Sequence, residues 1–178
     1  MLKGQKTNIR AIELQDLERI NAWANDLNLW VLLGGWHFPY STTNTKNWIE
    51  NINCNDKSNQ YFAIANETNE IIGTISLTSI DWKNRGATYG IMIGDARSRG
   101  KGYAKDAVDT LIKYVFEELG LVRIESDIID SNTVSLNFHL KNGWIKEGEK
   151  KYADYRGGKW HKKINIAFTL DEYTRTKK

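Results

Sequence analysis

The stretch Arg99-Gly100-Lys101-Gly102-Tyr103-Ala104 decides how this chain folds, because of the segments on either side of it. Residues 86–94 precede it and predict a β-strand. A helix is predicted after it, since apolar side chains recur three and four residues apart on one face: Ala104, Ala107, Val108, Leu111, Ile112, Val115, Phe116 and Leu119. A glycine turn between a strand and a helix points backbone N–H groups and the positive end of the helix dipole at one place. That place suits a phosphate.

Two common phosphate motifs are excluded by the spacing of these glycines. The phosphate loop of nucleotide hydrolases has four residues between its glycines and a Ser or Thr after its Lys, and neither feature is present. The dinucleotide fingerprint needs a third glycine, and Lys105 stands in its place. The turn alone is also compatible with a tight strand-to-helix connection that binds nothing.

A wider pattern resolves this choice. Arg99-x-x-Gly102-x-Ala104 resembles the Arg/Gln-x-x-Gly-x-Gly/Ala signature of the GNAT superfamily of N-acetyltransferases, which binds the pyrophosphate of acetyl-coenzyme A (acetyl-CoA). Further segments follow in that family's order, namely 89–93, 123–125, 132–135 and 142–148. The chain most resembles the branch that contains ribosomal-protein alanine acetyltransferases and spermidine acetyltransferases. The resemblance is strongest between Gln60 and Leu170.

The hydrophobic pattern predicts an α/β fold. Strands are expected at 6–12, 61–65, 71–80, 86–93, 121–129, 144–155 and 160–170. Helices are expected at 14–23, from Thr42 or Thr43 to 52, at 104–119, and from Ser131 or Asn132 to 142. The resulting order βααβββαβαββ is that of the GNAT-type fold, a mixed, mostly antiparallel central sheet flanked by helices. We expect one N-acetyltransferase domain over residues 1–178.

Composition limits the possible partners. Apolar residues make up 40% and charged residues 26%, an ordinary soluble composition. A net charge of +3 is too small to indicate nucleic-acid binding. The longest apolar run, Leu29–Leu33, cannot span a bilayer, and no leader segment opens the chain. We therefore expect a cytoplasmic protein that binds neither nucleic acid nor membrane.

The cysteine and histidine content predicts no disulfide and no metal site. Cys54 is the single cysteine, so an internal disulfide is excluded. The three histidines, His37, His139 and His161, lie far apart without the spacing of metal ligands.

The resemblance implies how acetyl-CoA is bound. The backbone of Ile91, Met92 and Ile93 is expected to pair with the pantetheine arm as an added strand would, and to face the developing oxyanion. The pyrophosphate is expected at Arg99, Gly100, Lys101, Gly102, Tyr103 and Ala104. Asn132 and Ser135 are the remaining expected contacts with the coenzyme.

The general acid departs from the family pattern. Relatives place a tyrosine seven residues after the asparagine that is Asn132 here, and this chain has His139 there. Histidine titrates near pH 6.5 and a thiol near 8.5, so an imidazolium could protonate the departing sulfur. Ser135 is the rival, because its position matches a serine proposed as the acid in the ribosomal-protein branch. A further alternative is that His139 only lines the sulfur pocket.

A general base is harder to identify. Many relatives carry Glu where this chain has Thr88, which cannot accept a proton at neutral pH. Glu125 and Asp127 lie on one side of the following strand, because side chains alternate along it. Glu147 is a third option. An acceptor amine with a lowered pKa would need no dedicated base.

The first third of the chain should select the acceptor. Trp36, His37 and Tyr40 belong to an aromatic loop that is expected to wall the acceptor site, although such rings can equally pack the helices on the sheet. We expect a primary amine, either of a small molecule or of a protein N-terminus. Alternatives are a polyamine-specific enzyme and, because of Thr88 and His139, a non-catalytic acyl-CoA-binding regulatory domain. A homodimer is also expected.

Overall fold

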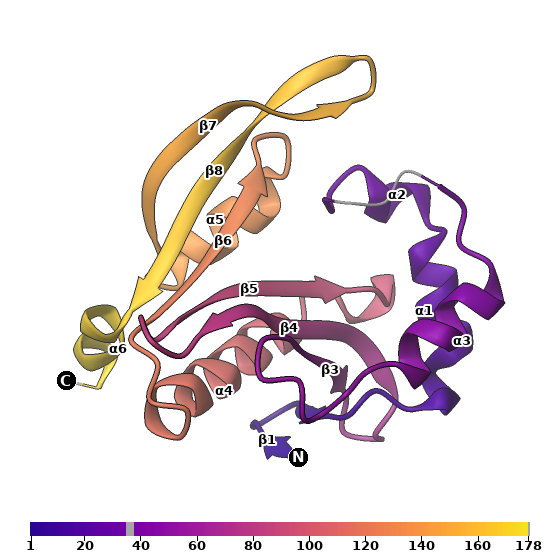
Figure 1. Cartoon of the computed structure of the whole chain (residues 1–178), viewed down its shortest axis with the longest axis horizontal. Helices are drawn as coiled ribbons and strands as arrows, with labels where there is room; N and C mark the ends of the chain where they lie inside the picture. The colour runs from indigo at the N-terminus through magenta and orange to yellow at the C-terminus, as the bar shows by residue number, and fades with distance from the viewer. Residues whose placement is uncertain (35–37, 178) are drawn as a thin grey trace.

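The computed structural model describes residues 1–34 and 38–177. Its centre is a sheet of eight strands in the order β1-β2-β3-β4-β5-β6-β8-β7 (Figure 1). The strands are β1 (Leu2–Lys3), β2 (Asn8–Arg10), β3 (Gln60–Ala65), β4 (Ile71–Asp81), β5 (Gly86–Ile93), β6 (Arg123–Ile129), β7 (Ile145–Arg156) and β8 (Lys159–Thr169). Every pairing is antiparallel except that of β5 with β6. The predicted mixed, mostly antiparallel sheet is confirmed.

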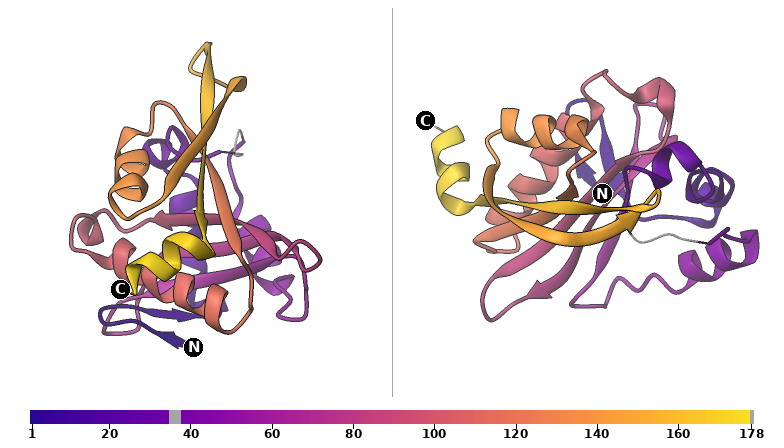
Figure 2. Two further views of the ribbon diagram at one scale, coloured as in Figure 1. Left: turned by 90° about the vertical axis from the view of Figure 1, so that its left-hand side faces the viewer. Right: turned by 90° about the horizontal axis from the view of Figure 1, so that it is seen from above.

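Helices flank this sheet. They are η1 (Leu14–Asp16), α1 (Leu17–Ala24), α2 (Leu27–Trp30), α3 (Thr42–Glu50), η2 (Ala96–Ser98), α4 (Tyr103–Glu117), α5 (Thr133–Lys141) and α6 (Leu170–Thr176). Helices α1 to α3 gather at one end of the molecule, and α4 runs along the sheet (Figures 1 and 2). The long β7–β8 hairpin extends away from the β3–β5 portion.

Two apolar clusters hold these layers to the sheet. The larger one includes the predicted stripe of α4, where Ala107, Leu111 and Val115 are fully buried. The smaller one contains Ile20 and Trp23 of α1 together with apolar residues of α3 and the sheet. Neighbouring strand residues supply both clusters, because successive side chains point to opposite faces of the sheet. Burying one Leu or Ile side chain contributes about 1.5–3 kcal/mol, so the α4 stripe anchors that helix firmly.

Three details of the predicted order were wrong. The structure adds β1, α2 and α6, which the hydrophobic pattern did not reveal. The expected last strand ends at Thr169 rather than at Leu170, because Thr169 and Glu172 form a reciprocal capping box that starts α6. Helix α3 is capped by Ser41, whose hydroxyl accepts from the N–H of Asn44, and not by either threonine.

The described helices do not include one that is both long and apolar enough to cross a membrane.

Candidate active site

A cleft opens in the sheet where β5 and β6 separate. Their parallel pairing covers only Gly86–Thr88 and Arg123–Glu125, and beyond it the two strands diverge (Figure 1). The resulting cavity has a volume of about 300 Å³. It is lined by Leu32, Leu33, Gly34, Thr74, Ser76, Tyr89, Gly90, Ile91, Met92, Ser126, Asp127, Ile128, Ile129, Asn132, Ser135, His139, Asp154 and Lys163. The end of β5 therefore presents an edge without a β6 partner, as the strand-addition prediction requires.

The glycine turn leads directly into α4. Gly100 and Gly102 have φ angles of +73° and +88°, which side chains strongly disfavour. Apart from its two chain neighbours, no described residue has an atom within 4 Å of a Cβ added at Gly100, so the turn is open on that side. The Arg99 side chain bonds to the end of β5, because its Nε donates to the carbonyl of Ile93 at 3.0 Å and its Nη2 to that of Gly94 at 3.2 Å. Arg99 thereby fixes the turn against the end of β5.

A lysine from the N-terminal segment reaches the same turn. Lys6 Nζ donates to the carbonyl of Lys101 at 3.2 Å and lies 3.4 Å from a Cβ placed on Gly102. The backbone around Lys6 is fixed by Asp106, whose carboxylate accepts from the N–H of Lys6 at 3.1 Å and from the hydroxyl of Thr7 at 2.6 Å. Burial would raise the pKa of Asp106, but these hydrogen bonds hold it below its usual value. Asp106 is thus an ionised anchor for Lys6.

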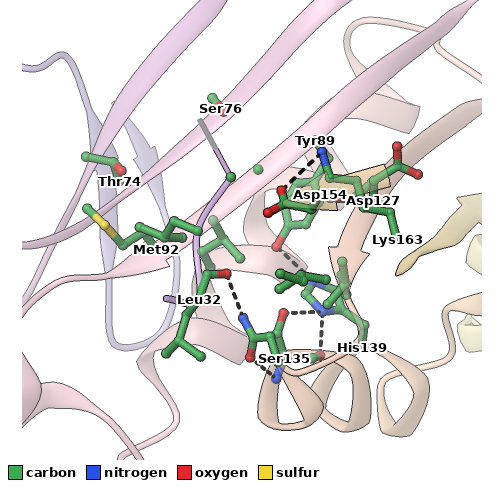
Figure 3. Close-up of a pocket in the computed structure, with 18 residues that line it drawn as sticks. Leu32, Thr74, Ser76, Tyr89, Met92, Asp127, Ser135, His139, Asp154 and Lys163 are labelled. Atoms are coloured by element: carbon green, nitrogen blue, oxygen red, sulfur yellow. Dashed lines mark hydrogen bonds and ion pairs between the residues drawn. The ribbon is translucent and has the colours of Figure 1, made fainter. Parts of the chain in front are cut away.

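His139 lies at the bottom of the cleft, on the inner face of α5 (Figure 3). It is 2% exposed and packs edge-on against Tyr89 and Trp144, with ring centroids 5.7 and 5.0 Å away. Its Nδ1 lies 2.8 Å from the carbonyl oxygen of Ser135 and 3.4 Å from the Ser135 hydroxyl. Its Nε2 lies 3.4 Å from the hydroxyl of Tyr89.

This network assigns a tautomer to His139. A carbonyl oxygen can only accept a hydrogen bond, so Nδ1 carries the proton and donates a hydrogen bond to the carbonyl oxygen of Ser135. Nε2 is then the lone-pair nitrogen, and the Tyr89 hydroxyl donates to it. Burial lowers the pKa of His139, which favours the neutral imidazole. Burial also raises the pKa of Tyr89 well above 10.0, so its phenol keeps its proton.

Two of the candidate bases, Glu125 and Glu147, pair with Arg123 and are not among the residues that line the cleft. Glu125 accepts from Arg123 Nη2 at 2.6 Å, and Glu147 accepts from Arg123 Nη1 at 2.8 Å. The Arg123 guanidinium holds the pKa of Glu147 below its usual value. Neither side chain is brought to the His139 network by the fold.

Asp127 does line the cleft, but its carboxylate is already paired. It accepts from Lys150 Nζ at 2.6 Å and from Asn165 Nδ2 at 3.1 Å, and it points away from the His139 imidazole (Figure 3). Burial would raise the pKa of Asp127, and the bond from Lys150 is the main contact that holds it below its usual value. A carboxylate in this state is a weak proton acceptor.

Comparison with known proteins decides the family. Residues 6–145 match the family described as Acetyltransferase (GNAT) domain. This chain belongs to the GNAT acetyltransferases.

This GNAT chain is similar to other N-acetyltransferases along most of its length. The SPbeta prophage-derived N-acetyltransferase YokL of Bacillus subtilis is 26% identical over 172 residues, which cover 96% of this chain and 93% of the relative. The spermidine N(1)-acetyltransferase of Vibrio cholerae is 25% identical over 146 residues, 82% of each chain. The resemblance inferred from the sequence is confirmed, and the chain is an N-acetyltransferase.

The fold is also that of a solved family member. The crystal structure of spermidine N-acetyltransferase from Vibrio cholerae in complex with CoA and spermine superimposes with a TM-score of 0.84 at 22% identity. The match covers 94% of this chain and 98% of that one.

Long-range contacts fix the part of the cleft that is formed by the segment after α2. Residues 32–34 line the cleft from the segment after α2. Asn132 caps α5, and its Nδ2 donates to the carbonyl of Leu32 at 3.1 Å. Arg156 Nη1 donates to the carbonyl of Leu33 at 2.6 Å. Asn132, which was expected to contact the coenzyme, ties the segment after α2 to α5.

The aromatic loop is only partly described. Trp36 and His37 lie outside the described residues. Tyr40 lines a separate cavity of about 200 Å³ that adjoins the cleft. Phe38 of the same loop is 78% exposed.

Four side chains at the site were missed from the sequence. Tyr89 falls within the predicted strand 86–93, and the alternation of side chains along that strand is the signal that places it on the face of Ile91. No nearby residue indicates that Lys6 belongs to the site, because its partners follow about a hundred residues later in the sequence. Asp154 and Lys163 come from the β7–β8 hairpin, whose register shifts between Lys146 and Gly148. Two residues of β7 oppose one of β8 there, so the later residues of β7, Asp154 included, take the opposite face from the one that simple alternation gives.

Proposed function

We propose that this chain transfers the acetyl group of acetyl-CoA to a primary amine of a small molecule in the cleft between β5 and β6. The observation that carries the proposal is the divergence of these strands after Thr88, beside the glycine turn of α4. Acetyl-CoA supplies an acetyl group activated as a thioester. The residues present fit this donor in two places.

The first place is the turn. The open space at Gly100 and the ammonium of Lys6 next to Gly102 form a positively charged cradle at the N-terminus of α4. Backbone N–H groups and a nearby cation are what a pyrophosphate requires. The proposed contacts are the expected residues Arg99 to Ala104, with Lys6 added to them.

The second place is the free edge of β5. The expected residues Ile91, Met92 and Ile93 lie beyond the last pairing with β6, so their backbone can take an extended ligand chain. Backbone donors on this edge would also stabilise negative charge on the acetyl oxygen, worth roughly 3 kcal/mol for each well-placed donor. Ser135 lines the same cleft from α5.

Proton transfer is assigned to the Tyr89–His139 pair. Amide formation removes one proton from the acceptor nitrogen and adds one to the sulfur as the C–S bond breaks. A neutral His139 accepts a proton at Nε2 by way of the Tyr89 hydroxyl and returns it to the sulfur, so no separate carboxylate base is needed. Ser135, whose hydroxyl lies beside Nδ1, is the competing proton donor.

Substituting His139 tests this assignment. His139→Gln is expected to lower kcat by roughly 10²–10⁴-fold while acetyl-CoA affinity changes little. Thiol release with an amine panel gives kcat, and calorimetry gives the affinity. Ser135→Ala serves as the matched variant from the same helix. A larger loss in Ser135→Ala than in His139→Gln would assign the proton transfer to the serine instead.

The pH profile distinguishes the two protonation states of His139. Burial lowers the pKa of His139, so its neutral form is present above pH 6.5 and is lost as the pH falls through the lowered value. The wild-type profile should therefore contain an acid limb below pH 6.5 that His139→Gln lacks. An alkaline limb that disappears in His139→Gln would instead support the imidazolium acid expected from the sequence.

Coenzyme binding without thiol release from any small amine would overturn the small-molecule proposal and favour a protein N-terminus as the acceptor.

A further inference from the structure

A second cavity lies next to the reaction cleft, between helices α1 and α3 and the β3–β5 part of the sheet. Its volume is about 200 Å³. It is lined by Ile20, Ala24, Tyr40, Thr45, Trp48, Tyr61, Thr74, Ile75, Ser76 and Met92. None of these lining residues carries a charge, and three of them are aromatic.

The second cavity shares a wall with the cleft. Thr74, Ser76 and Met92 line both spaces. In the β4–β5 ladder Thr74 pairs with Met92 and Ser76 pairs with Gly90, so these residues lie on one face of the sheet. Figure 3 shows Thr74 and Met92 across the cleft from His139. A molecule whose amine lies near Gly90 can therefore extend over these residues into the second cavity.

The charges along this path do not suit a polyamine. The described carboxylates that line the cleft are Asp127 and Asp154. Asp127 is paired with Lys150, while Asp154 lies 3.1 Å from Arg156 Nε and 3.7 Å from Lys163 Nζ. A second ammonium group on the acceptor would meet carboxylates that are already neutralised and would lose its hydration without compensation.

The size and the walls of the second cavity favour an aromatic ring. An apolar cavity of about 150 Å³ is large enough to bind benzene. Trp48 and Tyr61 meet edge to face, with ring centroids 5.7 Å apart and planes at 73°, an arrangement that a further ring can join. We infer that the acceptor is an arylalkylamine, a primary monoamine with one aromatic ring on a short linker. This inference rests on the proposed function and names its substrate class.

The test compares acceptors that differ in the ring and in charge. Phenethylamine, ethylamine and spermidine are offered to the full chain with saturating acetyl-CoA, and thiol release gives kcat/KM for each. We expect kcat/KM for phenethylamine to exceed both others by about tenfold or more, because ring burial is worth a few kcal/mol at most and part of it is lost to ordering. A preference for spermidine would overturn the inference.

Variants locate the effect in the second cavity. Ala24→Leu adds volume to the lining and should lower kcat/KM for phenethylamine at least tenfold more than for ethylamine. Trp48→Ala removes an aromatic wall at the partly exposed rim and should act in the same direction if Ala24→Leu does not fold. Trp160→Ala, an exposed tryptophan on the hairpin, is the matched control and should leave the ratio unchanged.

Different results would contradict the arylalkylamine inference and the proposed function. If phenethylamine and ethylamine react equally well, or if the cavity variants lower both alike, the arylalkylamine inference fails while the proposed function stands. If no amine releases thiol although acetyl-CoA binds, the proposed function itself fails.

Discussion

The proposed donor side and the proposed acceptor side of the cleft are built in different ways. On the donor side, the turn from Arg99 to Gly102 and the edge of β5 offer mainly backbone groups, with Lys6 as an added charge. On the acceptor side, the surface consists of side chains from α1, α3, the segment after α2 and the β7–β8 hairpin. A site made of backbone depends on the fold and tolerates many sequences, whereas a site made of side chains changes with each substitution. The acceptor is therefore the property that sequence resemblance transfers least.

The largest expected effect is at Gly102. Its φ of +88° and its position at the start of α4 mean that Gly102→Val both strains the turn and fills the cradle beside Lys6. We expect coenzyme A binding to be abolished, measured by calorimetry. Gly157→Val, at φ +58° in the β7–β8 turn, imposes similar backbone strain far from the motif. If both variants keep wild-type affinity, the pyrophosphate does not bind at this turn.

Arg99→Ala is expected to cause the next largest loss of coenzyme A affinity. Removing its guanidinium frees the carbonyls of Ile93 and Gly94 and takes a charge from the turn. Because a charge-assisted hydrogen bond contributes roughly 1.5–3 kcal/mol, we expect coenzyme A affinity to fall about 10- to 100-fold. Arg97 provides the control, since its side chain is 81% exposed and Asp95 is its ion-pair partner among the described residues. Equal losses in the two variants would mean that only the general positive charge of the turn matters.

Lys6→Met tests the added cation of the donor side. It keeps the length of the side chain and removes the ammonium that lies beside Gly102. We expect coenzyme A affinity to fall about tenfold, and acceptor preference to stay the same. Lys3→Met removes the same charge from the exposed strand β1 and should have little effect. A matching loss in Lys3→Met would assign the effect to long-range electrostatics, which high salt would suppress.

The sequence was informative where one local rule governs the structure. The apolar stripe of α4 follows helical periodicity, and the left-handed turn at Gly102 needs glycine, so both could be predicted. Helix α6 could also have been found, because Thr169 and Glu172 have the capping-box spacing.

Contacts between distant segments could not be predicted in this way. Asp106 orders the backbone of Lys6 across about a hundred residues, and no periodicity links them. The register shift between Lys146 and Gly148 similarly places Asp154 on the face that lines the cleft, against simple alternation. The neutral state favoured at His139 depends on its burial by Tyr89 and Trp144, which only the assembled sheet creates.

Arg156 gives the smallest expected effect and tests the acceptor side alone. Its guanidinium donates to the carbonyls of Trp30 and Leu33, and it pairs with Asp154 at the edge of the cleft. Arg156→Ala should loosen the segment after α2 and raise the KM of the acceptor about three- to tenfold, since one or two hydrogen bonds to carbonyl groups are lost. Coenzyme A affinity should not change, because the donor side makes no described contact with this arginine. Arg85→Ala removes a comparable bond, to the carbonyl of Gly120, outside the residues that line the cleft, and should leave both quantities unaltered. A fall in coenzyme A affinity in Arg156→Ala would show that the two sides of the cleft are coupled, and the separation drawn between them would have to be abandoned.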